Sequence, residues 1–177
     1  MKHFIITGKK HAGKTTYTKE LVNILKNKGF KLYGFINIGT FKDNERDKFF
    51  IKSIHNHEER LFAERSNINN KLSFCSYNFY EDGFSFGGNQ YNNGIINKSD
   101  FIVVDEVGKW ELERKGFFYL FNKMPVFSSI ILVCRDDFKD DINQLIFNNM
   151  AEIISIDEDK YQVAEKIINT YNSLVRL

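Results

Sequence analysis

The chain has 177 residues, of which 42% are hydrophobic and 27% are charged, and its formal net charge at pH 7 is +2. This length suits one domain spanning residues 1–177, with enough chain to bury a hydrophobic core. A net charge this small does not favour nucleic acid or an anionic membrane as a partner. No stretch approaches the roughly 20 apolar residues that span a bilayer.

The N-terminal residues and the two cysteines indicate the cellular compartment of the protein. The apolar run Phe4–Ile6 is too short for a signal peptide. Cys75 and Cys134 lie in apolar contexts without metal-ligand spacing, so we expect both to be buried free thiols. Together these features predict a cytoplasmic protein. They give no indication of a protein partner.

The first predicted elements enclose a glycine-containing loop. Phe4–Ile6 is typical of a short buried strand, and apolar residues recur at helical spacing from Tyr17 to Leu25. Between them, residues 8–15 fit G-x-x-x-x-G-K-[ST], the phosphate-binding loop, in the strand–loop–helix context that it requires. We expect a nucleotide to be bound by Gly8, Lys9, Lys10, His11, Ala12, Gly13, Lys14, Thr15 and Thr16.

The residue types of this loop predict separate roles. Backbone N–H groups of the loop and of the first helical turn would face the phosphates, and the helix dipole would add to the attraction. Lys14 would reach the β- and γ-phosphates, and the Thr15 hydroxyl would bind Mg²⁺, the expected cofactor. Lys9 and Lys10 would add positive potential.

The middle of the chain predicts strands joined by hairpins. Successive Phe- and Tyr-rich segments without an intervening helix favour antiparallel pairing. We expect strands over Lys31–Ile38, Lys48–Ile54, Glu59–Arg65 and Leu72–Tyr80, with a loop over Phe41–Asp47. A helix is predicted over Gly88–Asn97, after a cluster of glycines.

The second half alternates strands with helices. We expect strands over Phe101–Val104, Ser129–Cys134 and Glu152–Ile156, and helices over Leu112–Lys123, Asp137–Phe147 and Tyr161–Leu174. Such alternation gives a parallel sheet covered on both faces. The predicted fold class is therefore α/β: a P-loop NTPase three-layer sandwich with a mostly parallel central sheet and an antiparallel hairpin region in the middle segment. Ligands then bind beyond the C-terminal ends of the strands.

Two acids end the strand that begins at Phe101. In phosphate-loop proteins an Asp at a strand end helps to hold Mg²⁺ together with the loop Ser or Thr, so we expect Asp105 to be a metal ligand with Thr15. Glu106 is placed to orient or deprotonate the water that attacks the γ-phosphate. Taken alone, an Asp-Glu pair at a strand end also fits a simple entry into a loop. The upstream phosphate loop favours the metal and catalytic roles.

Arg135 follows a predicted strand, so it should point toward the same edge of the sheet. There it would stabilise charge in the transition state, as an arginine finger does. The alternative is a surface Arg that pairs with Asp136 or Asp137. The sequence leaves both open, and we include Arg135 with Glu106 and Lys14 as a candidate catalytic residue.

The stretch Val104–Leu112 reads V-D-E-V-G-K-W-E-L and resembles the D-E-I-G-x-M-E-L signature of the thermophile-type (cancer-related) nucleoside-triphosphatase family. The G-K-T-T of the loop and the Gly34-Phe35 pair also resemble that family. The resemblance implies a compact α/β phosphate-loop fold and Mg²⁺-dependent hydrolysis of nucleoside triphosphates with broad base tolerance. It matches Glu111 to an acid that the family keeps, to which we assign no role. Trp110 stands where the family has Met.

Three functions follow from these motifs. The first is Mg²⁺-dependent hydrolysis of ATP, GTP and other nucleoside triphosphates to the diphosphate and phosphate. The second is a kinase for a small molecule or nucleotide, for which the sequence shows no Arg-rich lid; only Arg46, Arg60 and Arg65 lie in the middle segment. The third is a nucleotide-binding accessory or switch module that resembles the GTP-binding proteins of molybdopterin dinucleotide synthesis. The sequence favours the first.

Overall fold

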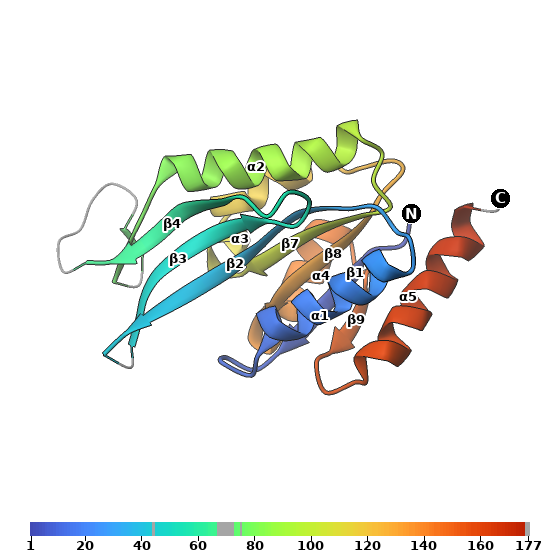
Figure 1. The fold of residues 1–177 in the computed structure, drawn as a ribbon, viewed down its shortest axis with the longest axis horizontal. Helices are drawn as coiled ribbons and strands as arrows, with labels where there is room; N and C mark the ends of the chain where they lie inside the picture. Colours follow the sequence, from blue (N-terminus) through green and yellow to red (C-terminus); the bar gives the residue numbers. More distant parts are fainter. Residues whose placement is uncertain (44, 67–72, 75, 176–177) are drawn as a thin grey trace.

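The computed structural model describes residues 1–43, 45–66, 73, 74 and 76–175 (Figure 1). Within these residues the strands form one mixed sheet of nine strands, in the order β5-β6-β4-β3-β2-β7-β8-β1-β9. The strands are β1 Phe4–Gly8, β2 Leu32–Lys42, β3 Glu45–Ser53, β4 Glu59–Arg65, β5 Ser73–Phe74, β6 Tyr77–Phe79, β7 Phe101–Val107, β8 Ser129–Arg135 and β9 Glu152–Ser155. The helices are α1 Lys14–Asn27, α2 Glu81–Ile96, α3 Lys109–Leu112, α4 Lys139–Phe147 and α5 Lys160–Val175, with 3₁₀ helices η1 Gly116–Asn122 and η2 Asp136–Phe138.

The sheet has a parallel part and an antiparallel part. Strands β2, β7, β8, β1 and β9 pair in parallel. Strands β3, β4, β6 and β5 continue from β2 in antiparallel pairs, and in Figure 1 β2, β3 and β4 project to the left, beyond α1. The predicted α/β fold with hairpins in the middle segment is confirmed.

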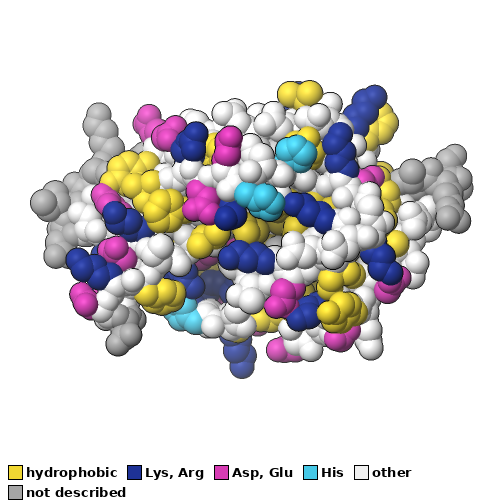
Figure 2. Space-filling model, viewed as in Figure 1, with side chains coloured by type: hydrophobic (Ala, Val, Ile, Leu, Met, Phe, Trp, Pro, Cys, Tyr) yellow, Lys and Arg dark blue, Asp and Glu magenta, His cyan; other side chains and the backbone are white. Residues whose placement is uncertain are grey.

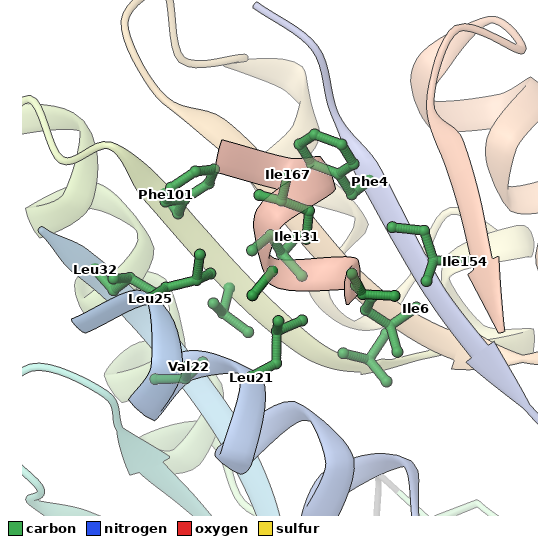
Figure 3. Packing of buried hydrophobic residues seen from close by; sticks show 14 of the residues in the cluster. Phe4, Ile6, Leu21, Val22, Leu25, Leu32, Phe101, Ile131, Ile154 and Ile167 are labelled. Atoms are coloured by element: carbon green, nitrogen blue, oxygen red, sulfur yellow. The ribbon is translucent and has the colours of Figure 1, made fainter. Parts of the chain in front are cut away.

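The molecule has two hydrophobic cores, one on each face of the sheet. Successive side chains of a strand point to opposite faces, so Phe4 packs in one core and Ile5 in the other. The first core lies between the sheet and helices α1 and α5, where Leu21, Leu25 and Ile167 meet strand residues (Figure 3). The second lies under α2, η1 and α4. Because β2, β7, β8, β1 and β9 run parallel, their C-terminal ends lie together along one edge of the sheet.

The predicted loop over Phe41–Asp47 is wrong. Strand β2 continues to Lys42 and β3 begins at Glu45, with the pairs Phe41–Arg46 and Lys42–Glu45 in register. Most of this hairpin tip is exposed, so its side chains show no hydrophobic alternation and its sequence looks like a loop. Backbone pairing between β2 and β3 stabilises the hairpin tip as strand.

Two predicted helices have different bounds in the structure. Helix α2 begins at Glu81, seven residues before the predicted Gly88, because glycines with low helix propensity hid its first turns. The predicted helix over residues 112–123 is instead the short α3 followed by η1. The break falls at Arg114 and Gly116, which both have positive φ.

The predicted strand over residues 72–80 and the prediction for Cys75 fall partly or wholly on residues that the structure does not describe. In place of one strand over residues 72–80 the structure has the separate strands β5 and β6, and residues 72 and 75 lie outside the described part of the chain. The expectation for Cys75 lies there too, whereas Cys134 is a buried free thiol. No helix in the described part of the chain is both long and apolar enough to cross a membrane.

Candidate functional site

The phosphate-binding loop connects β1 to α1 at the C-terminal edge of the parallel strands. Gly13, the residue before α1, has φ +90°, a left-handed conformation that glycine adopts without the steric cost of a Cβ. Because Gly13 has no side chain to cap the helix, the first N–H groups of α1 are left for an anion. The Nζ of Lys14 donates to the carbonyl oxygens of Gly8 at 3.2 Å and Lys9 at 2.9 Å, so the ammonium lies over the loop.

The structure brings Thr15 and Asp105 together, although 90 residues separate them in the chain. The Thr15 Oγ1 donates to Oδ2 of Asp105 at 3.0 Å. The backbone N–H of Asn37, on β2, donates to the same oxygen at 3.1 Å. Thr15 comes from the start of α1, Asp105 from the end of β7 and Asn37 from the adjacent strand, so three elements converge at this point.

The Asp105 carboxyl is buried, with 2% of its surface exposed. Burial raises its pKa from 3.8 to about 7, and the negative charge of Glu106 acts in the same direction. The hydrogen bonds from Asn37 and Thr15 lower the pKa and partly offset this rise. A carboxyl in this state binds either a proton or a cation readily, because both relieve the cost of a buried charge.

Glu106 lies at an irregular point of β7. The pairing of β7 with β8 shifts between Val104 and Val107, and Glu106 has φ +64°, which is uncommon for a residue with a side chain. Its side chain is exposed while Asp105 and Val107 on either side are buried. The bulge therefore turns the Glu106 carboxylate into the groove beside the phosphate-binding loop.

The acid without an assigned role, Glu111, is buried, with 4% of its surface exposed. Its carboxylate accepts hydrogen bonds from the backbone N–H groups of Gly108 and Phe117, each at 2.8 Å. A Cβ on Gly116 would lie 2.3 Å from Oε1 of Glu111, so the turn leaves no room for a larger residue there. Glu111 thus ties the segment after Glu106 to the start of η1.

Arg135 stands at the end of β8 and lines the groove. Its guanidinium forms an ion pair with Asp137 and lies 5.1 Å from the centroid of the Phe138 ring. Asp136 is occupied elsewhere, since it accepts a hydrogen bond from Thr7 at 2.7 Å. Of the two expectations for this residue, the pairing with Asp137 is what the structure shows; a role in catalysis stays a prediction.

One groove of about 800 Å³ joins these groups. Among the predicted nucleotide-binding residues, Lys10, His11, Gly13, Lys14, Thr15 and Thr16 line it, whereas Gly8 is buried at the end of β1 and Lys9 and Ala12 face outward. The lining also contains groups for which no role was predicted, among them Asn37, Arg46 and a set of aromatic side chains from the antiparallel strands and from α2 and α3. Asn37 could have been found from the sequence, because it lies two residues after Phe35 near the C-terminal end of the predicted strand over Lys31–Ile38.

The oxygen atoms at this point suit Mg²⁺, which prefers hard oxygen ligands and keeps several waters. Thr15 and Asp105 offer a hydroxyl and a carboxylate, and the nearby Asn37 has a buried Oδ1 without a hydrogen-bond partner. No group of three or more His, Cys, Asp or Glu side chains able to hold a metal occurs among the described residues. A metal here would therefore share its coordination with phosphate oxygens and water.

A phosphate-binding loop between β1 and α1, with a buried Asp at the end of a nearby parallel strand, defines the P-loop NTPase class. Comparison with known proteins narrows the class. A family model described as NTPase matches residues 3–169. The chain is 32% identical over 119 residues to the nucleoside-triphosphatase THEP1 of Sulfolobus acidocaldarius, covering 67% of each protein. It is 28% identical over 137 residues to the THEP1 of Sulfurisphaera tokodaii, covering 71% of this chain and 75% of the relative.

The chain belongs to this NTPase family, and it is a nucleoside triphosphate hydrolase. The fold is also similar to the solution structure of a human cancer-related nucleoside triphosphatase, with a TM-score of 0.73 over 98% of both chains. At 16% identity, that likeness shows the fold alone. The family resemblance predicted from the sequence motifs is confirmed.

Proposed function

We propose that this hydrolase cleaves ATP, GTP and other nucleoside triphosphates to the diphosphate and phosphate with the help of Mg²⁺. The observation that carries the proposal is the 3.0 Å contact between Thr15 and Asp105, with the exposed Glu106 next to it in the same groove. Together these residues supply the phosphate, metal and water positions that the reaction needs.

The loop would bind the triphosphate through its N–H groups and Lys14. The Lys14 ammonium already lies over the loop on two carbonyl oxygens, and it would exchange these for phosphate oxygens, which form stronger charge-assisted hydrogen bonds. Lys10 and His11 in the lining would add donors beside the loop.

Thr15 and Asp105 would hold the metal, which when bound neutralises charge on the β- and γ-phosphate oxygens. Glu106 would orient the attacking water and accept its proton, while the water oxygen bonds to the γ-phosphorus and the bond to the bridging oxygen breaks. An exposed carboxylate fits this role because it must exchange its proton with solvent after each turnover.

A kinase is the second candidate, because one observation favours it. The sequence showed no Arg-rich lid, yet the structure places Arg46 and Arg65 in the lining of the same groove. A switch module without activity is not proposed, since the chain belongs to a family of hydrolases.

The Glu106→Gln variant tests the hydrolytic assignment. Phosphate release is measured with Mg²⁺ and a panel of ATP, GTP, CTP and UTP. We expect the variant to lose about 10²- to 10⁴-fold in turnover, the range that a positioned base contributes. It should still bind Mg²⁺ with AMP-PNP, a non-hydrolysable ATP analogue, because Glu106 does not hold the phosphates.

Two further variants complete the experiment. Glu113→Gln is the matched control, since Glu113 is exposed and pairs with Lys115 away from the groove; it should hydrolyse at the normal rate. Lys14→Ala should weaken AMP-PNP binding tenfold or more, because a hydrogen bond to a charged group contributes about 1.5–3 kcal/mol. An unchanged rate in Glu106→Gln would remove Glu106 from the mechanism.

A further inference from the structure

The groove has two halves of different chemistry. One half is the phosphate-binding loop with Thr15, Asp105 and Glu106. The other is lined by aromatic side chains from the antiparallel strands and from α2 and α3: Phe49, Phe62, Tyr77, Phe79, Phe84 and Trp110. The hydrolytic site proposed above uses only the first half.

The aromatic side chains form a connected wall. The Trp110 ring lies 4.6 Å from the Phe79 centroid and 5.8 Å from that of Phe84, where the two planes differ by 24°. Phe62 packs behind both phenylalanines at 5.0 and 4.8 Å. Phe62 is buried, whereas Phe79, Phe84 and Trp110 are half-buried. The wall therefore has a supported back and a front that faces the groove, as binding sites for flat apolar groups do.

The Arg46 side chain lies beside this wall. The Arg46 guanidinium is 5.3 Å from the ring centroid of Phe41 and 5.4 Å from that of Phe49. Its Nε is buried without a hydrogen-bond partner, and Arg46 forms no ion pair with any residue that the structure describes. Arg65, by contrast, is paired with Glu45. The Arg46 guanidinium is therefore not committed to a carboxylate of the described residues, and it can pair with an anionic group in the groove.

The order of strands separates the wall from the triphosphate. The loop follows β1, Asp105 and Glu106 end β7, and Phe49 and Phe62 lie on β3 and β4 at the far side of β2. Because Thr15, Asp105 and Glu106 mark the γ-phosphate end of the bound triphosphate, the aromatic half begins where the triphosphate ends. A molecule held there would face the γ-phosphate.

We propose that the aromatic half of the groove binds a second molecule: a planar aromatic ring joined to an anionic group, the chemistry of a nucleoside monophosphate. The ring contacts Phe79 and Trp110, and the anionic group pairs with Arg46. This inference rests on the proposed function, since it assumes that the loop half holds the nucleoside triphosphate.

Trp110 is the only tryptophan of the chain, so its fluorescence reports on the wall directly. The protein is first saturated with AMP-PNP and Mg²⁺, and binding of that analogue is verified by calorimetry. AMP, GMP, CMP and UMP are then titrated in turn. We expect a saturable change in Trp110 fluorescence with at least one of them, and a much weaker response to the matching nucleoside or to inorganic phosphate.

Two variants of Arg46 test whether its positive charge, and not a general effect on folding, supports monophosphate binding. Arg46→Gln should weaken monophosphate binding tenfold or more, whereas Arg46→Lys should retain most of it. The matched control is Arg60→Gln, because Arg60 also lies over a ring, that of Phe86 at 5.2 Å, but outside the groove lining. It should leave the affinity unchanged.

The outcomes distinguish this inference from the function on which it rests. If AMP-PNP binds and hydrolysis proceeds, but none of the four monophosphates gives a saturable signal, the second-molecule site is wrong and the hydrolase stands. The same titration is repeated without AMP-PNP. A fluorescence signal that is present without AMP-PNP and absent with it would assign the wall to the substrate's own base and overturn the inference. Equal loss of affinity in Arg46→Gln and Arg60→Gln would also overturn it. Failure of AMP-PNP to bind would instead contradict the proposed function.

Discussion

Glu111 shapes the turn that carries Glu106. Its buried carboxylate accepts two backbone N–H groups, one from Gly108, two residues after Glu106, and one from Phe117 at the start of η1. Burial raises the pKa of Glu111, and the two N–H donors counter that rise. With Glu106 held at positive φ, the position of its carboxylate depends on this local support. We therefore interpret Glu111 as a positioning residue.

The Glu111→Gln variant tests this role. A Gln side chain offers one acceptor oxygen, so its amide N–H would face one of the two donors and leave a buried N–H unsatisfied. We expect the free energy of unfolding to fall by about 1–3 kcal/mol. We also expect kcat to fall while the affinity for Mg²⁺ and AMP-PNP changes little, which a purely structural loss would not produce. Normal kcat in a folded variant would contradict the positioning role.

At the scale of elements, His3 joins the start of β1 to β8 and α4. Its Nδ1 accepts a hydrogen bond from the backbone N–H of Ile130 at 3.0 Å, and its ring stacks on Phe147 with centroids 4.9 Å apart. Burial is the main cause that lowers the pKa of His3 from 6.5 to about 4, with the positive charges of the N-terminus and Lys2 adding to the effect. The folded protein therefore prefers the neutral ring.

The sign of the resulting pH dependence follows from this preference. The stabilisation is complete above pH 6.5 and is lost as the pH falls from 6.5 toward 4, because the unfolded chain takes up a proton that the folded chain excludes. The loss amounts to at most about 3 kcal/mol. Urea unfolding at pH 7 and pH 4.5 should show that the wild type loses more stability at pH 4.5 than His3→Asn does, by about this amount, because other titrating groups such as Asp105 contribute equally in both proteins. An identical pH dependence in both proteins would exclude His3 as its source.

The elements of the parallel part could be predicted from the sequence, and those of the antiparallel part only in outline. Buried parallel strands read as short apolar runs between helices, so β1, β7 and β8 stand out. The first turns of α2, before the predicted start at Gly88, were missed because their glycines pack against neighbours: a Cβ on Gly83 would lie 2.8 Å from the Cα of Phe62, and one on Gly87 would lie 2.7 Å from the Phe117 ring. Tertiary packing, which local propensity does not report, explains why these positions are small.

At the scale of the whole molecule, local sequence patterns predict only the part of the site that does not depend on tertiary packing. The loop motif and the strand-end acids are local patterns, so their meeting at Thr15 and Asp105 could be predicted from the topology of parallel strands. The proximity of Asn37, the aromatic wall and Arg46 depends on how β2, β3 and β4 pair and twist over α2 and α3, and no short motif encodes that. Figure 2 shows the surface consequence: on the face drawn, Lys and Arg side chains are interspersed with Asp and Glu, with hydrophobic side chains between them.

Since α1, β2 and β7 meet at the proposed metal position, a bound ligand should stabilise the whole fold. At 100 times its Kd, a ligand adds about 2.7 kcal/mol to the free energy of unfolding, which corresponds to about 5–10 °C in Tm for a domain of this size. We expect AMP-PNP to give this shift with Mg²⁺ and a clearly smaller one with EDTA. Thermal unfolding followed by circular dichroism measures both.

Two threonines of α1 show whether the metal-dependent part of that shift depends on the contact with Asp105. Thr15→Val removes the hydroxyl that bonds to Asp105 and should lose the Mg²⁺-dependent part of the shift. Thr18→Val is the matched control: the Thr18 Oγ1 is buried without a hydrogen-bond partner, so its removal should leave the shift intact and the fold at least as stable. If Thr15→Val keeps the full difference between Mg²⁺ and EDTA, the metal is held elsewhere, and the contact between Thr15 and Asp105 is a structural hydrogen bond.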